Sequence, residues 1–439
     1  MGFFEIKNKV IKCLEEGEYT YEARENIDVK NYNSRFILIP KNTIKIGENT
    51  LKILFSRNYN NDGSGLHKFT DPEDKKQYLY TDFEPFDANK LFPCFDQPDL
   101  KAKYTLEVEA PKNWIVISYA KEKTIKDIGE NKVWTFPESL KFSTYIFSLH
   151  AGEYKVWEDS FEGMPLRLLA RQSLAKYVIP SEWFGISKQG FKFYNNYFGV
   201  NYPYGKYDQI IVPDFNAGAM ENVAAVTFTE NYVFLCKATV IEQQRRSDTI
   251  LHEMAHMWFG DLVTMKWWNG LWLNESFATF MANYSLKKAT VYQDVWQTFF
   301  ASTKSWAYWE DNLVTTHPIE LPVNDTSSAF SNFDGITYGK GASVLKQLNF
   351  LLGEEKFQKG IQKYFAKYAE QNTRIENFIG SLEEGSGKKL DSWVEQWLKT
   401  TGSNKIKVDY ICDKNKISSF SLSQDQAPRE HKTQIALLK

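Results

Sequence analysis

The sequence predicts a multidomain chain in which an all-β N-terminal domain precedes an α+β or mainly helical domain and a short C-terminal pair of strands. The length of 439 residues points to two or three domains, because a typical domain has about 150 residues. Short apolar runs rich in β-branched and aromatic residues fill residues 1–155, whereas longer helical runs dominate residues 156–398. These two patterns predict domain limits near residues 155 and 398.

The N-terminal domain is expected to consist of short strands joined by turns. Its strand signals are apolar runs at residues 35–39, 50–55, 114–118 and 143–149. Clusters of Asn, Asp and Gly at residues 60–65 and 129–131 are typical of the turns between such strands. Residues 1–155 therefore predict an all-β domain.

The next part of the chain changes to helical periodicity. Helices are expected at residues 240–259, 271–288, 341–352 and 354–370. Residues 209–212 add a strand signal to this part. After Gly402, residues 405–411 and 417–422 alternate between apolar and polar side chains, which predicts two strands. Two strands cannot form an independent domain, so residues 399–439 are expected to begin a further one.

The composition excludes several classes of protein. With 53 Lys and Arg against 55 Asp and Glu, the formal net charge is −2, so no nucleic-acid partner is expected. The four cysteines form no CxxC pair, which indicates neither a disulfide framework nor a cysteine zinc site. No apolar stretch approaches the roughly 18 residues of a membrane span, and the first residues lack the apolar region of a signal peptide. We therefore expect a soluble, cytoplasmic protein without a membrane span.

The helix expected at residues 240–259 has clear signals at both ends. Thr239, followed three residues later by Glu242, predicts a capping box, and Gly260 provides a stop. The apolar residues at 250, 251, 254, 255 and 257–259 make the helix apolar almost all round over this stretch, which indicates a buried helix.

The sharpest chemical signal is an HExxH motif on this helix, formed by His252, Glu253 and His256. Two histidines four residues apart share one helical face, so both imidazoles can bind a single metal ion. Glu275 follows His256 by 19 residues on the next expected apolar helix and would complete a His, His, Glu set with an open fourth position. That set is typical of a catalytic zinc site and predicts one Zn²⁺ per chain. The alternative is a pair of core histidines held by hydrogen bonds.

Further motifs accompany these residues. They occupy residues 92–98 (FPCFDQP), 218–222 (GAMEN), 267–275 (WWNGLWLNE) and 338–341 (YGKG). Together with HExxH and Glu275, they resemble the aminopeptidase N family of zinc metallopeptidases over essentially the whole chain. The resemblance implies a thermolysin-like α+β catalytic domain at residues 156–398, after the N-terminal β domain at residues 1–155. It also implies that residues 399–439 are the first strands of a β-sandwich, and that the chain is truncated at both ends relative to the family.

The resemblance also implies a role for each residue of the catalytic centre. His252, His256 and Glu275 would hold the zinc ion. Glu253 would take a proton from the attacking water and deliver it to the leaving amine. The Tyr338 hydroxyl would stabilise the oxyanion of the tetrahedral intermediate.

Substrate binding is implied in the same way. The segment that pairs with the substrate backbone along the edge of the active site consists of Gly218, Ala219 and Met220. Glu221 and Glu84 would bind the free α-amino group of the substrate. If residues 81–85 are extended, Asp82 lies on the same side as Glu84 and lines the pocket for the first substrate side chain. There it would favour Lys or Arg or a broad range, whereas bound calcium would favour acidic residues; the alternative is a solvated turn residue.

The expected partners are therefore peptides with a free N-terminus. A thermolysin-like endopeptidase, or a relative that also opens epoxides, fits less well because of the GAMEN segment and Glu84. A non-catalytic peptide-binding fragment of the same fold would be expected to have lost a ligand, the base or the tyrosine, and this chain keeps them all. Ser276 and Gly270 depart from the family pattern near Glu275, and we expect them to tune the site.

Overall fold

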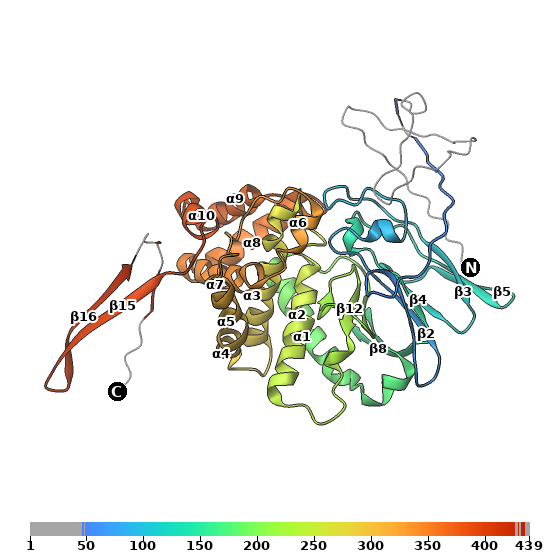
Figure 1. Cartoon of the computed structure of the whole chain (residues 1–439), viewed down its shortest axis with the longest axis horizontal. Helices are drawn as coiled ribbons and strands as arrows, with labels where there is room; N and C mark the ends of the chain where they lie inside the picture. Colours follow the sequence, from blue (N-terminus) through green and yellow to red (C-terminus); the bar gives the residue numbers. More distant parts are fainter. Residues whose placement is uncertain (1–45, 48, 426–428, 430–431, 435–439) are drawn as a thin grey trace.

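The computed structural model describes residues 46–47, 49–425, 429 and 432–434. The strand expected at residues 35–39 lies outside these residues. The described chain forms a β-rich part, a mixed part that carries the helices, and a C-terminal hairpin that extends away from both (Figure 1).

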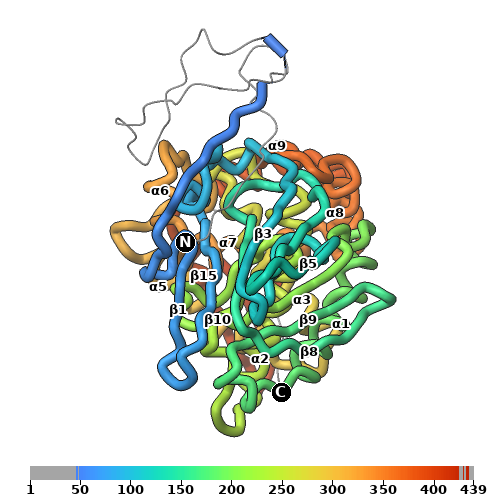
Figure 2. Tube along the Cα trace, turned by 90° about the vertical axis from the view of Figure 1, so that its right-hand side faces the viewer, coloured from blue at the N-terminus to red at the C-terminus, as the bar shows by residue number. Residues whose placement is uncertain are grey.

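The β-rich part contains two antiparallel sheets, and Figure 2 views the molecule from their side. The first sheet consists, in spatial order, of β1 (Gly65–Thr70), β2 (Gln77–Asp82), β7 (His150–Gly152) and β4 (Ile115–Ile117). The second consists of β3 (Glu107–Pro111), β6 (Asn131–Thr135) and β5 (Thr124–Ile128). β4 confirms the strand expected at residues 114–118, and Gly129, with a φ of 57°, lies in the expected turn between β5 and β6.

Two strand predictions in this part are wrong. Residues 50–55 form no strand with the described residues. Residues 143–149 pass through a 3₁₀ turn at Thr144–Ile146 before β7 begins. The turn is fixed by a side chain, because the Thr144 hydroxyl donates to the Asp96 carboxylate at 2.8 Å. The apolar residues of this segment are buried in the core without belonging to a strand, so tertiary contacts override their β propensity.

A five-stranded sheet begins the mixed part. Its strands, in spatial order, are β11 (Ala219–Met220), β12 (Ala225–Thr229), β10 (Tyr207–Val212), β9 (Met164–Ala170) and β8 (Lys155–Phe161). β12, β10 and β9 run parallel, whereas β11 and β8 pair antiparallel at the two edges. β10 confirms the strand expected at residues 209–212. A buried cluster that includes Tyr78, Tyr80 and Ile210 packs this sheet against the first sheet of the β-rich part.

The described residues form ten α-helices and a short pair of parallel strands. The helices are α1 (Pro180–Phe198), α2 (Val240–His256), α3 (Trp272–Ala289), α4 (Val295–Phe299), α5 (Ser305–Glu310), α6 (Thr326–Phe330), α7 (Gly341–Leu352), α8 (Glu354–Tyr368), α9 (Ile375–Ser386) and α10 (Asp391–Trp397). The strands are β13 (Thr264–Met265) and β14 (Asn372–Thr373). α3, α7 and α8 confirm three expected helices, and none of the described helices is both long and apolar enough to cross a membrane.

The fourth expected helix, α2, begins as its sequence predicts and ends three residues early. The Thr239 side chain accepts the N–H of Glu242 at 3.2 Å, and the Glu242 carboxylate accepts the N–H of Thr239 at 2.7 Å, which confirms the capping box. The helix ends at His256 rather than at residue 259. The chain then turns at Gly260, whose φ of 120° favours glycine, and the Gly260 N–H donates to the carbonyl of Val263.

Apolar packing fixes α2 and α3 at the centre of the helical part. α3 is buried from Trp272 to Leu286. α1 approaches α2 closely at Gly190, where a Cβ atom would lie 2.6 Å from the Leu251 side chain. Side chains on the facing surfaces of α2 and α3 are therefore held by a close-packed core.

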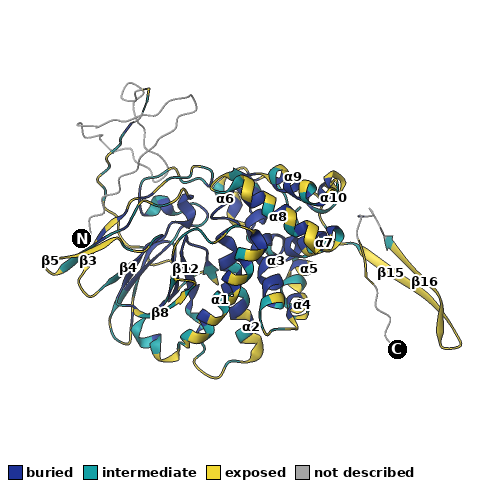
Figure 3. Ribbon diagram, turned by 180° about the vertical axis from the view of Figure 1, so that it is seen from behind, coloured by how far each residue is buried: buried dark blue, intermediate teal, exposed yellow. Residues whose placement is uncertain are grey.

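The C-terminal hairpin confirms the two strands expected after Gly402. β15 (Lys405–Asp413) pairs antiparallel with β16 (Lys416–Asp425), with Val408 opposite Leu422 and Tyr410 opposite Phe420. Every residue of β15 is exposed, as Figure 3 shows.

Candidate active site

Three side chains that can bind a metal meet where α2 packs on α3. His252 and His256 lie one turn apart on α2, and Glu275 lies in the first turn of α3. Nε2 of His252 lies 3.0 Å from Nε2 of His256 and 3.3 Å from Oε2 of Glu275, and Nε2 of His256 lies 3.5 Å from that same oxygen. Ligand atoms around a tetrahedral zinc ion lie about 3.3 Å apart, because each bond is about 2.0–2.1 Å long. These three atoms, called the donor triangle below, therefore fit a zinc ion.

Neighbouring groups orient both imidazoles toward the donor triangle. Nδ1 of His256 donates to the carbonyl oxygen of Phe259 at 3.0 Å. Nδ1 of His252 lies 3.4 Å from Oγ1 of Thr279. A proton on Nδ1 leaves Nε2 with the lone pair that a metal ligand needs.

Carboxylates give the site an excess of negative charge. Burial raises the pKa of Glu253 well above its ordinary value, and the charges of Glu221 and Glu275 raise it further, although His256 opposes them. Burial also raises the pKa of Glu221, to about 6. The pKa of Glu275 is lowered despite its burial, because His256 and His252 stabilise its negative charge. A bound divalent cation would balance this excess of carboxylates.

Gly218, Ala219, Met220 and Glu221 lie along the edge of the five-stranded sheet next to the donor triangle. Ala219 and Met220 form β11, which is the outermost strand of that sheet in the described chain. Glu221 follows directly, is 3% exposed, and places Oε1 3.8 Å from Nδ1 of His256. An extended peptide could therefore pair with the outer edge of β11 while one of its ends lies near Glu221.

A buried polar chain, which the sequence did not indicate, lies behind Glu221. The hydroxyl of Thr227 donates to Oδ1 of Asn222 at 2.8 Å, and Nε2 of His150 lies 2.8 Å from the same hydroxyl oxygen. Burial lowers the pKa of His150 to about 3, so its imidazole is neutral. These hydrogen bonds fix Asn222, the residue that follows Glu221.

Two carboxylate oxygens near the donor triangle have no hydrogen-bond partner within the described chain. They are Oε1 of Glu84 and Oε1 of Glu221, and both are buried. Glu84, Glu221 and Glu275 each place one oxygen within 4.8 Å of the others. Burial and the charge of Glu221 raise the pKa of Glu84 well above its ordinary value. Because a buried acceptor without a partner costs about 1–3 kcal/mol, this pair is suited to binding a positively charged group.

Asp82 lies near this pair, although the local backbone differs from the one expected. β2 ends at Asp82, and Glu84 lies in a turn in which the N–H of Asp87 donates to the carbonyl of Phe83 at 2.8 Å. The condition for Asp82 and Glu84 to lie on the same side, an extended backbone over residues 81–85, is therefore not met, because this turn bends the chain after Asp82. Burial raises the pKa of Asp82 to about 7, and the charges of Asp87 and Glu221 contribute. Asp82 is thus half-buried and lies near enough to Glu221 for that charge to raise its pKa.

Tyr338 lies next to two residues of the donor triangle, His252 and Glu275. It lies in a π-helical turn at Ile336–Lys340, called the Tyr338 turn below, which runs directly into α7. Its ring centroid lies 6.1 Å from that of His252 and 6.2 Å from that of Trp306. Burial raises the pKa of Tyr338 well above its ordinary value, and nearby carboxylates, led by Glu275, raise it further. The Tyr338 hydroxyl therefore keeps its proton and can donate a hydrogen bond.

Ser276, one of the two departures from the family pattern, connects α3 to the Tyr338 turn. Its hydroxyl donates to the carbonyl of Thr337 at 2.6 Å, so the residue after Glu275 is bonded to the residue before Tyr338. A Cβ atom at Gly341 would clash with this hydroxyl, which explains the glycine there. At the other departure, Gly270, a Cβ atom would lie 3.0 Å from the Cβ atom of Met265, which leaves little room for a side chain.

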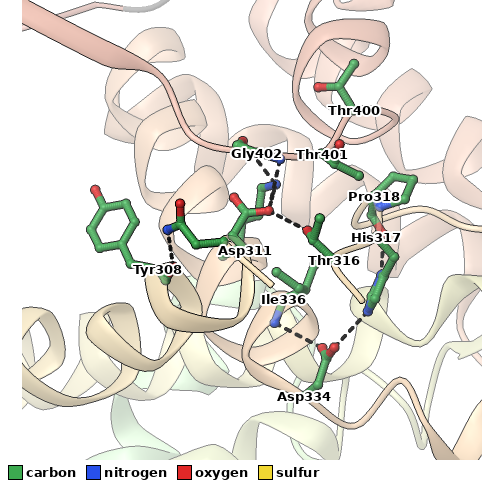
Figure 4. A network of polar contacts seen from close by, with 12 residues as sticks. Tyr308, Asp311, Thr316, His317, Pro318, Asp334, Ile336, Thr400, Thr401 and Gly402 are labelled. Atoms are coloured by element: carbon green, nitrogen blue, oxygen red, sulfur yellow. Dashed lines mark hydrogen bonds and ion pairs between the residues drawn. The ribbon is translucent and has the colours of Figure 1, made fainter. Parts of the chain in front are cut away.

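Acidic side chains hold the two ends of the same turn, and sequence reasoning did not find them. The Glu310 carboxylate accepts the N–H of Gly335 at 2.7 Å. The Lys340 ammonium donates to the Asp311 carboxylate at 2.9 Å, and Asp311 also accepts the N–H of Gly402 at 3.0 Å (Figure 4). The acidic residues at 310 and 311 have no local sequence signal that connects them to Tyr338, since they lie more than 20 residues before it.

The sequence matches the peptidase family M1 domain over residues 183–397 and the peptidase M1 N-terminal domain over residues 3–146. Aminopeptidase N of Streptomyces lividans is 45% identical over 386 residues, which are 86% of this chain and 45% of that protein. Tricorn protease-interacting factor F2 of Thermoplasma acidophilum is 38% identical over 349 residues, which are 79% of this chain and 43% of that protein.

A third similar protein comes from a fungus. Aminopeptidase 2 of Candida albicans is 35% identical over 369 residues, which are 82% of this chain and 39% of that protein. The chain thus spans less than half the length of these relatives. The described residues of the two domain matches lie in the β-rich and mixed parts of the structure. The chain therefore belongs to peptidase family M1.

Proposed function

We propose that this chain is a zinc-dependent aminopeptidase that removes N-terminal residues from peptides. The observation that carries the proposal is the donor triangle of His252, His256 and Glu275 beside the two unpartnered carboxylate oxygens of Glu84 and Glu221. The first group suits a divalent metal and the second suits a substrate ammonium. The names of two of the relatives, Aminopeptidase N and Aminopeptidase 2, support the same activity.

One zinc ion per chain would be held by His252, His256 and Glu275. When bound, it would supply Lewis acidity that polarises the scissile carbonyl and lowers the pKa of a water molecule. Glu253, the neighbour of His252, would accept the proton of that water and deliver it to the leaving amine. A raised pKa makes its carboxylate a stronger base, which suits the step in which it accepts a proton.

Tyr338 would act on the carbonyl oxygen. Its hydroxyl keeps its proton and would donate a hydrogen bond to the oxygen as negative charge develops there. Such a donor stabilises the transition state more than the bound substrate, so it acts on kcat more than on KM.

Glu221 and Glu84 would bind the α-ammonium of the substrate through charge-assisted hydrogen bonds. A fixed pair of carboxylates at a set distance from the donor triangle allows only the first peptide bond to reach it. The outer edge of β11, formed by Ala219 and Met220, would pair with the backbone of the bound peptide. Asp82, next to this group, would line the pocket for the first side chain and favour Lys or Arg or a broad range.

The proposal is tested by comparing the hydrolysis of aminoacyl amides with that of their N-acetylated forms, each with and without a chelator. An aminopeptidase cleaves only the free amines and loses activity with the chelator. Chelator-sensitive cleavage of both forms would indicate a thermolysin-like endopeptidase instead. Binding of peptides without any cleavage would indicate the non-catalytic alternative.

A further inference from the structure

The helix that carries Tyr338 begins at an aspartate that binds three consecutive backbone amides. Oδ1 of Asp334 accepts the N–H of Ile336 at 3.0 Å (Figure 4). The same oxygen accepts the N–H of Thr337, also at 3.0 Å. The main-chain carbonyl of Asp334 accepts the N–H of Tyr338 itself, also at 3.0 Å. The Asp334 side chain thus satisfies the first N–H groups of this helix, and its position fixes the backbone on which Tyr338 lies.

His317 fixes the second oxygen of the capping aspartate. Nε2 of His317 lies 2.8 Å from Oδ2 of Asp334, and Nδ1 of His317 lies 2.7 Å from the carbonyl oxygen of Pro318 (Figure 4). A carbonyl oxygen and a carboxylate can only accept, so both ring nitrogens donate and the imidazole is positively charged. Burial and the charge of Lys340 oppose this, but the hydrogen bonds to Asp334 and Pro318 outweigh them and raise the pKa of His317.

The loop that carries His317 is itself anchored. The hydroxyl of Thr316 donates to the Asp311 carboxylate at 2.8 Å, and Asp311 also holds Lys340 at the far end of the Tyr338 turn. His317 therefore reaches Asp334 from a fixed segment of chain, as Figure 4 shows.

A π-helical turn is rare and is often found at a functional site. Here it places the centroid of the Tyr338 ring 6.1 Å from that of His252 and 6.2 Å from that of Trp306. A displacement of about 1 Å at such a position can lower a reaction rate about 100-fold.

We infer that His317 and Asp334 are positioning residues that hold the Tyr338 hydroxyl toward the donor triangle. The inference rests on the proposed function, since it concerns how Tyr338, one of the proposed catalytic groups, is held in position. Neither residue would touch the substrate. The turn keeps its bonds to Glu310, Asp311 and Ser276 without this pair. Loss of the pair should therefore shift Tyr338 rather than unfold the helix.

The test is a double-mutant cycle in the full chain, using His317→Ala and Asp334→Ala, each made in the parent and in Tyr338→Phe. In the parent, each substitution should lower kcat roughly 10- to 100-fold with little change in KM. In the Tyr338→Phe background, the same substitution should lower kcat by less than about twofold, because the hydroxyl that it misplaces is already absent. His317→Gln keeps one N–H donor for Asp334 and should recover part of the loss.

Asp325→Ala is the matched control. Asp325 caps α6 by accepting the N–H of Ser328 at 2.7 Å, but α6 carries no candidate site residue. Its loss should change kcat by less than about twofold. Zinc content and thermal midpoints, measured for every variant, identify the ones that fold. If His317→Ala does not fold, His317→Gln and Asp334→Asn enter the cycle instead.

Equal losses in both backgrounds would overturn the inference, because they would show a general structural effect. If Tyr338→Phe lowers kcat but His317→Ala and Asp334→Ala do not, the inference fails and the proposed function stands. If Tyr338→Phe itself leaves kcat unchanged, the proposed role of Tyr338 fails, and the inference fails with it.

Discussion

The donor triangle lies on two long helices that are held by apolar packing, whereas the Tyr338 turn is short and is held by polar side chains. α3 is buried along most of its length around Glu275, and α2 packs tightly on α1 at Gly190. The Tyr338 turn instead depends on hydrogen bonds from Ser276, Glu310 and Asp334. The difference indicates that the proposed metal ligands and the proposed oxyanion donor are separately supported. Substitution of a ligand of the donor triangle should therefore lower zinc content, whereas changes in the Tyr338 turn should lower kcat alone.

The largest effect is expected from removal of one corner of the donor triangle. His256→Phe should lose its zinc and all hydrolysis, because two remaining ligands cannot complete the site. Elemental analysis of the purified chains should find one zinc ion per parent chain and almost none in the variant. Tyr338→Phe is the matched control and should keep its zinc. Equal zinc in His256→Phe and the parent would refute the metal assignment.

Substitution of the proposed base should separate metal binding from turnover. Glu253→Gln keeps the shape of the side chain but cannot accept a proton, so kcat should fall by roughly 10²- to 10⁴-fold while zinc content stays the same. Steady-state kinetics together with elemental analysis check this. Turnover close to that of the parent would assign the base to another residue.

Tyr338→Phe should have a smaller effect, because it alters the Tyr338 turn and leaves the donor triangle intact. Removal of one preorganised donor is expected to lower kcat by roughly 10²- to 10³-fold, with zinc content unchanged and KM little affected. The measurement is kcat and KM for one aminoacyl amide in the parent and the variant. A change in KM alone would remove Tyr338 from its role on the oxyanion.

The smallest expected effect concerns Asp82 and depends on pH. The pKa of Asp82 is raised to about 7, so its carboxyl is neutral below that pH and becomes negatively charged above it. The ratio of kcat/KM for a lysyl amide to that for a leucyl amide should therefore rise by up to about tenfold as the pH increases through this value.

The check is to measure this ratio one pH unit below and one above the pKa, in the parent and in Asp82→Asn. Each series is repeated with calcium, which would shift the preference toward acidic residues if it binds to Asp82. A parent ratio that is independent of pH, and equal to that of the variant, would show that Asp82 does not contact the first side chain.

The donor triangle and its two helices could be predicted from the sequence far better than the support of the Tyr338 turn. The periodicity of α2, its capping box and the spacing of its two histidines are local properties, so they predicted the helix and the shared face. Glu275 was expected from its spacing and from the family resemblance, and it lies at the donor triangle. The proposed roles of these residues stay predictions, as do the domain limits near residues 155 and 398 and the cytoplasmic location.

The support of the Tyr338 turn could not be predicted, because its partners are brought together by folding. His317 and Glu310 lie 21 and 28 residues before Tyr338, and no periodic pattern connects them. The wrong strand predictions have a similar cause. At residues 143–149, bonds from side chains such as Thr144 to distant groups decide the backbone conformation, against the local β propensity.

The central claim is that Glu84 and Glu221, next to a zinc site, restrict cleavage to the first peptide bond. The most direct test is to incubate the chain with a peptide of defined sequence and record product masses over time, beside the same peptide with an acetylated N-terminus. The account predicts sequential loss of single residues from the free peptide and no cleavage of the acetylated one. Cleavage of the acetylated peptide at a comparable rate, or release of internal fragments from either, would contradict it.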